Sequence, residues 1–251
     1  MIPKIKFREM TLQENIDIIK WAYYEKNKTL SVHDYTIKYF PELANLDNNL
    51  SKKEEYKKIE KIVTNKYKQC YKEIKNNTKR YNSLWKEYND KYFSMLSTYF
   101  NIEWPNITII EATVGLIPVF PRYLDQFSFS IGIVEDWKLI ETAAHETLHF
   151  MWFEKWKQLH PETPRKEYDS PYLIWQYSEM VTDPILNNKP FSEIFDNVFT
   201  ERSYDNFYKL KDKNNSVMNV LKNIYTENIP IEQKMNKGYT YIKSILESTS
   251  H

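Results

Sequence analysis

The sequence predicts an α+β fold, in which a helical N-terminal lobe and a helical C-terminal part flank a small mixed or antiparallel sheet. Two changes of hydrophobic period carry this prediction. Apolar residues recur every three or four positions up to Pro105, then alternate at period two, and return to the helical period from about Asp136. The chain has 251 residues, of which 41% are hydrophobic, so we expect a single folded unit made of segments 1–104, 105–189 and 190–251.

The N-terminal lobe begins with a helix signal. Thr11 and Glu14 have the spacing of a capping box, in which each side chain satisfies a free backbone N–H, and a helix over about 12–27 should follow. A second amphipathic pattern starts at Ser51. We expect it to break at Asn76-Asn77 and to continue as another long helix, so that the two form a hairpin.

Three short apolar segments follow and predict strands. Ile107–Val114 is rich in β-branched residues, and Phe127–Ile133 alternates with small residues at period two. Leu116–Phe120 contains Pro118, which cannot donate to a strand ladder, so this segment should be an edge strand or a loop.

Two further helices are expected in the middle of the chain. The first should run from about Asp136 through Gln158. The second should open at Ser170-Pro171, a cap followed by proline, and stop near Asp183-Pro184. The remaining residues from 190 read as short helices.

Composition excludes several classes of protein. Three glycines in the whole chain cannot build a loop that cradles phosphates, and the single Cys70 allows no intramolecular disulfide and no cysteine-based zinc site. No secretory signal and no stretch long enough to span a membrane is evident, so we expect a cytoplasmic protein, with secretion by another route still open.

The overall charge is balanced, but one segment is basic. Lys and Arg total 35 against 34 Asp and Glu, which gives no global attraction to nucleic acid or an anionic membrane. Segment 52–80 holds eleven basic and four acidic residues. It could bind an acidic partner or nucleic acid, but a solvated helix face explains it more simply, and we expect no nucleic-acid partner.

The segment from His145 to His149 contains the pattern HExxH within the predicted central helix. Two histidines four positions apart on a helix differ by about 6 Å of rise and 40° of rotation, so both imidazoles can reach one metal ion. Glu146 lies next to them and can accept a proton from a metal-bound water. A helix whose histidines merely pack against aromatic residues would give the same pattern by chance.

A catalytic zinc site needs a third protein ligand, and the motif's own helix does not supply one. Trp152 and Lys155 stand where the longest HExxH pattern requires Gly and His. His160 would lie about 16 Å further along a continuing helix, beyond reach. The third ligand must therefore come from another segment.

The motif followed by Glu179 and, four positions later, Asp183 resembles the gluzincin, or thermolysin-like, zinc metallopeptidases. The resemblance implies zinc bound by His145, His149 and Glu179, with Asp183 orienting the first motif histidine through its free ring N–H. Around Glu179 only these two acidic residues match the longer family consensus. Alternatively, Glu179 and Asp183 are simply two acidic residues, four positions apart, on a solvated helix face.

The same resemblance implies that the strand at Phe127–Val134 pairs with an extended substrate, and that Gly132 allows close approach. Simple packing of the strand is equally consistent. An oxyanion donor is also implied, but the sequence does not select one among twenty tyrosines; Tyr172 is one candidate.

These observations predict a zinc-dependent metallopeptidase that hydrolyses a peptide or protein substrate with Glu146 as general base. A restricted regulatory protease would carry the same residues. The alternative is a non-catalytic binding or scaffold protein with a structural or vestigial zinc site. The intact Glu146 favours the enzyme, because a structural site has no use for a base.

Overall fold

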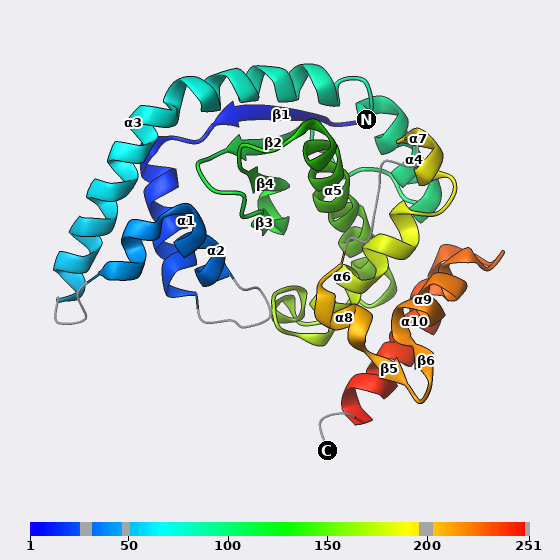
Figure 1. The fold of residues 1–251 in the computed structure, drawn as a ribbon. Helices are drawn as coiled ribbons and strands as arrows, with labels where there is room; N and C mark the ends of the chain where they lie inside the picture. The colour runs from blue at the N-terminus through cyan, green and yellow to red at the C-terminus, as the bar shows by residue number, and fades with distance from the viewer. Residues whose placement is uncertain (26–31, 47–50, 196–202, 249–251) are drawn as a thin grey trace. The chain divides into compact units, whose positions relative to one another are not determined.

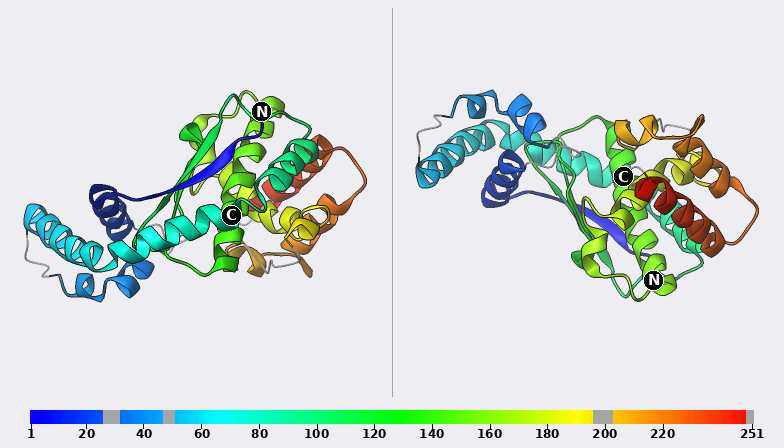
Figure 2. Two further views of the ribbon diagram at one scale, coloured as in Figure 1. Left: turned by 90° about the horizontal axis from the view of Figure 1, so that it is seen from above. Right: turned by 90° about the horizontal axis from the view of Figure 1, so that it is seen from below.

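The computed structural model describes residues 1–25, 32–46, 51–195 and 203–248 (Figures 1 and 2). Its chain divides into two compact units. The sheet unit comprises Lys4–Glu87 and Ile109–Thr142. The helical unit comprises Met1–Pro3, Tyr88–Thr108 and Ala143–His251. Among the described residues, no helix combines the length and the apolar character needed to cross a membrane.

The sheet unit contains a four-stranded mixed sheet, so the prediction of an α+β fold with a small mixed sheet is confirmed. The strands are β1 (Lys4–Glu9), β2 (Ile109–Val114), β3 (Arg122–Tyr123) and β4 (Ser128–Ile131), in the order β1-β2-β4-β3. β1, β2 and β4 run parallel, and β3 pairs antiparallel with β4.

Strand β1 lies in a segment for which we expected only helices. Its alternation is visible in the sequence, because Ile5 and Phe7 are buried while Lys4 and Lys6 are exposed. Asn82 covers the outer edge of β1: its side chain accepts from the Phe7 N–H at 3.0 Å and donates to the Phe7 carbonyl at 2.9 Å. A six-residue strand was too short to stand out beside the helical pattern that follows it.

The first predicted helix is present as α1 (Leu12–Tyr24), with the capping box of Thr11 and Glu14 formed. Positions 26 and 27 of the prediction lie outside the described residues. Next come α2 (Val32–Tyr39) and a 3₁₀ turn, η1 (Pro41–Asn45).

The predicted break at Asn76-Asn77 is wrong, because α3 (Lys52–Trp85) passes through it as one helix of 34 residues. Polar side chains there bond back to the helix itself: Asn77 donates to the Glu73 carbonyl and Thr78 to the Ile74 carbonyl, both at 2.9 Å. The two asparagines are therefore accommodated without a turn, and no hairpin forms at this point.

Strand β4 is an inner strand, paired with β2 on one side and β3 on the other. Just before β3 begins, the Pro121 carbonyl accepts from the Ser130 N–H at 3.0 Å. A Cβ atom on Gly132 would lie 2.6–2.7 Å from backbone atoms of Ile117 and Pro118. Because Gly132 has no side chain, the loop at Ile117 and Pro118 can pack directly against it. This packing accounts for the glycine without the expected substrate.

The helical unit is built from α4 (Asn89–Phe100), most of α5 (Asp136–Leu159) and α6–α10. The later helices are α6 (Leu173–Leu186), α7 (Phe191–Ile194), α8 (Asp205–Lys209), α9 (Val217–Thr226) and α10 (Ile231–Ser248). A small hairpin of β5 (Lys211–Asp212) and β6 (Asn215–Ser216), and two 3₁₀ turns, η2 (Leu124–Gln126) in the sheet unit and η3 (Arg165–Tyr168), complete the elements.

The bounds of α6 differ from the prediction at both ends. The helix starts at Leu173 with Tyr172 as its N-cap, and it continues past Pro184. A proline removes only one N–H, and here it stands in the last turns of the helix, where few bonds follow it. The Asn187 N–H closes the end on the Asp183 carbonyl at 3.0 Å.

Candidate metal centre

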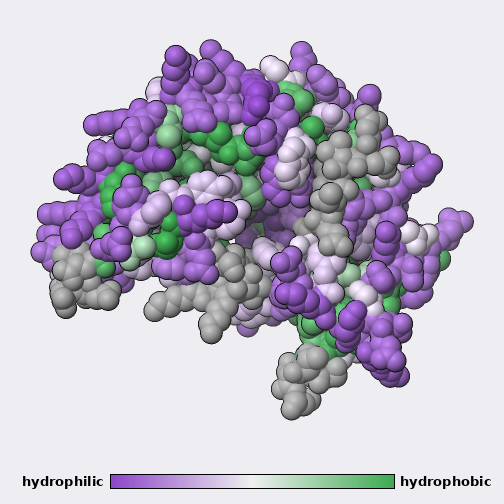
Figure 3. Space-filling model, viewed as in Figure 1, coloured by the Kyte–Doolittle hydropathy of each residue, from purple (hydrophilic) through white to green (hydrophobic). Residues whose placement is uncertain are grey.

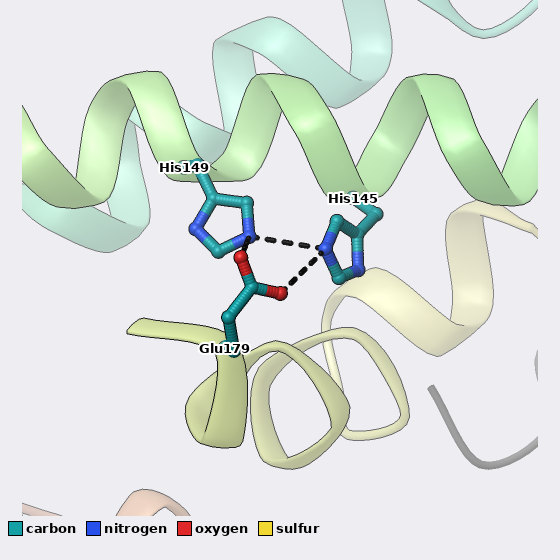
Figure 4. Close-up of side chains that lie close together, drawn as sticks. All are labelled: His145, His149 and Glu179. Atoms are coloured by element: carbon teal, nitrogen blue, oxygen red, sulfur yellow. Dashed lines mark hydrogen bonds and ion pairs between the residues drawn. The ribbon is translucent and has the colours of Figure 1, made fainter. Parts of the chain in front are cut away.

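Three predicted ligands come together between α5 and α6 (Figure 4). His145 and His149 leave α5 on one face, one turn apart, and the carboxylate of Glu179 on α6 faces both rings. The two Nε2 atoms lie 3.0 Å apart, and Glu179 Oε2 and Oε1 lie 3.2 Å from His145 Nε2 and 3.4 Å from His149 Nε2.

This cluster has the dimensions of a metal site. Ligand atoms bound at 2.0–2.2 Å to a tetrahedral zinc ion are separated from one another by about 3.3–3.6 Å. The observed separation of 3.4 Å lies within this range, and those of 3.0 and 3.2 Å fall short of it by up to a few tenths of an ångström, so a small expansion admits the ion. Two imidazoles and one carboxylate are also donors that zinc accepts.

Burial of the three side chains is graded. His149 is fully buried and the side chain of Glu179 is 6% exposed, whereas that of His145 is 16% exposed. The cluster therefore approaches the solvent on the side of His145. Within the residues that the structure describes, the metal-ligand group consists of these three side chains, without a fourth His, Cys, Asp or Glu.

Glu146, the expected general base, follows His145 on α5 and is 5% exposed. A general base has to stand within hydrogen-bond reach of the attacking water, and Glu146 is next to a candidate ligand along the chain. Its role stays a prediction, as do the ligand roles of the three clustered residues.

Asp183 makes different contacts from those expected. Its carboxylate accepts from the Tyr208 hydroxyl at 2.6 Å and from the Asn187 side chain. In the described part of the chain it has no hydrogen bond to His145. The expected orienting contact is thus not made, and Asp183 instead ties α6 to α8.

The segment before α8 adds a second tie to α6, which the sequence did not reveal. The Ser203 hydroxyl donates to the backbone carbonyl of Glu179 at 3.1 Å, and the Ser203 N–H donates to the Tyr208 hydroxyl at 3.3 Å. Neither residue belongs to a motif. Only the folded chain brings Ser203 to the carbonyl of the candidate ligand and Tyr208 to Asp183.

A buried aromatic layer holds α5 against α6. The rings of Trp152 and Trp156 on α5 stack at 5.2 Å, and both meet Tyr177 of α6 edge-on. The Tyr177 hydroxyl donates to the Met235 carbonyl at 2.9 Å, and burial raises its pKa well above the ordinary value, so it stays protonated. Gly238 of α10 leaves room for that hydroxyl, which a Cβ atom would hit.

Neither Glu141 of α5 nor His160 belongs to the metal-ligand group of the described residues. His160 stacks on Trp156 and its Nε2 lies 2.8 Å from Asn236 Oδ1. Glu141 pairs with Lys138 at 3.2 Å. Tyr172, the candidate oxyanion donor, caps α6 and is 40% exposed.

Comparisons with protein-family models, with curated proteins and with solved structures gave no match to this chain. The resemblance to gluzincins therefore rests on the motif residues alone.

Proposed function

We propose that the chain is a zinc-dependent metallopeptidase with His145, His149 and Glu179 as its zinc ligands. One observation carries the proposal: the candidate site offers three protein donors and reaches the solvent beside His145. Structural zinc sites are closed by four protein ligands, whereas catalytic sites keep one position for water or substrate. A three-donor cluster next to a buried glutamate matches the second kind.

Each residue has a distinct task in the proposed reaction. A zinc ion bound there would polarise the peptide carbonyl and lower the pKa of the attacking water. Glu146 takes one proton from that water as its oxygen bonds to the carbonyl carbon, and passes the proton to the amine nitrogen as the C–N bond breaks. The aromatic layer fixes α5 against α6, so that Glu179 meets both imidazoles without rearrangement.

The substitution Glu146→Gln tests the proposal. It keeps the size of the side chain and a hydrogen-bonding group but removes the proton acceptor, so hydrolysis should fall by at least about 100-fold while zinc content and unfolding temperature persist. The assay uses a peptide library, because no specificity is assigned. Glu154→Gln, on the same helix and paired with Lys157 at 2.6 Å, is the control and should keep its activity.

One result would reject the enzyme, and another would reject Glu146 as its base. A zinc-loaded parent protein inert across the library would favour the binding or scaffold protein with a structural metal. Cleavage by Glu146→Gln at the parent rate would show that another group is the base.

A further inference from the structure

A row of lysines on α3 forms a surface that the proposed peptidase chemistry does not use. Six lysines recur at steps of three, four or seven positions, which places them within about 60° of arc on one face and along about 33 Å of helix. We call this set the lysine row: Lys57, Lys61, Lys68, Lys72, Lys75 and Lys79. Figure 3 shows hydrophilic side chains along the outer edge where Figure 1 draws α3.

Packing fixes the direction of the lysine row. The opposite side of α3 is buried through Ile59, Val63, Ile74 and Tyr81, of which Tyr81 meets Phe7 of β1 edge-on at 5.7 Å. The helix cannot rotate without losing this apolar contact. All six lysines are exposed as a consequence.

The lysine row is not neutralised by the protein. In the part of the chain that the structure describes, none of its six members forms an ion pair, whereas lysines elsewhere do. The nearby Glu60 is engaged by Lys20 of α1 at 2.6 Å, on the flank of the helix. Unpaired like charges one turn apart repel each other, and an external anionic surface would relieve that repulsion.

The composition of the lysine row favours a diffuse anionic surface. Every member is lysine, a flexible point charge, while the one arginine of α3, Arg80, is engaged by Asp136 at 3.1 Å and by the Val134 carbonyl at 2.9 Å. Nucleic-acid sites draw on arginine forks, which the lysine row does not contain. Single strands lie in grooves between several stacking aromatics, whereas Tyr71 is the one exposed aromatic side chain of α3. Rows of four to eight basic residues on an amphipathic helix are typical of binding to acidic lipids.

From these observations we infer that the lysine row docks the protein on an anionic lipid bilayer. Binding is peripheral and electrostatic, because the apolar side of α3 is already used inside the sheet unit. Each lysine near such a surface strengthens binding about fivefold, so removing four should weaken it more than 100-fold, on the order of the product of the single effects.

Sedimentation with lipid vesicles tests the inference. The 251-residue protein should pellet with vesicles of 30% phosphatidylserine in phosphatidylcholine at 0.1 M NaCl. It should pellet neither with pure phosphatidylcholine nor at 1 M NaCl, where the Debye length falls from about 10 Å to 3 Å. The variant K68Q/K72Q/K75Q/K79Q should lose this binding. A control of equal charge, K91Q/K209Q/K211Q/K222Q, changes exposed lysines outside α3 and should keep it.

Three outcomes would overturn the inference. The parent protein does not bind the acidic vesicles, or both variants lose binding equally, or the parent binds a 20-base-pair DNA duplex through the lysine row and ignores vesicles. Circular dichroism of both variants establishes that they are folded.

Discussion

At the scale of single residues, the candidate site depends on side chains that anchor α6 as well as on the donors themselves. Tyr208 reaches Asp183 at 2.6 Å, and Ser203 reaches the carbonyl of Glu179 at 3.1 Å. Residues that hold a ligand's support in place commonly affect metal affinity by about 10–100-fold. We therefore regard Tyr208 as a positioning residue for Glu179.

A double-mutant cycle tests this role. Tyr208→Phe removes the donor and Asp183→Asn weakens the acceptor, so each should lower zinc affinity about tenfold. Because both break the same hydrogen bond, the double variant should lose little more than either single one. Zinc affinity is measured by competition with a chelator, and the free energy of unfolding is measured separately in urea. If Tyr208→Phe lowers the free energy of unfolding but leaves zinc affinity unchanged, Tyr208 has a structural role only and does not position Glu179.

The residues of the site differ in how visible they are in the sequence. The spacing of His145 and His149 predicts their convergence, because a helix turn is a local property. Glu179 could be proposed only through the family resemblance, since thirty positions of intervening chain fix no geometry. The partners of Asp183 depend on how α8 packs against α6, which no local pattern encodes.

At the scale of elements, hydrophobic period predicts the type of most helices and strands but locates their ends less well. α5 (Asp136–Leu159) matches its prediction to within a residue, because the period persists through it. The sequence placed the C-terminal ends of α3 and α6 too early, at Asn76-Asn77 and near Pro184. Asn and Pro end a helix only where the surrounding structure leaves backbone groups without hydrogen bonds.

The two glycines of the sheet unit should differ in their tolerance of a side chain. Gly132→Ala places a methyl group 2.6–2.7 Å from backbone atoms, which cannot move aside, so it should lower the free energy of unfolding by about 2 kcal/mol or more. Gly115→Ala meets chiefly the flexible end of Met10, with Sδ at 2.8 Å, and should cost clearly less. Urea denaturation measures both. Equal effects would show that the loop at Ile117 yields easily.

At the scale of the whole molecule, the chain combines a sheet unit with a helical unit that carries all three candidate ligands. Metal binding to the folded state alone stabilises a protein in proportion to the logarithm of the free metal concentration. Zinc should therefore raise the unfolding temperature of the parent protein. The three side chains could otherwise be held by hydrogen bonds among themselves, since 3.0–3.4 Å also suits those.

Titration of the metal-free protein with zinc decides between these two states most directly. We expect one zinc ion per chain, an affinity at least about 100-fold lower in His149→Ala and Glu179→Ala, and an unchanged affinity in His160→Ala, whose ring lies against Trp156. Calorimetry gives the stoichiometry and the affinity together. A parent protein that takes up no zinc, or variants at His149 and Glu179 that bind it as the parent does, would contradict the metal centre.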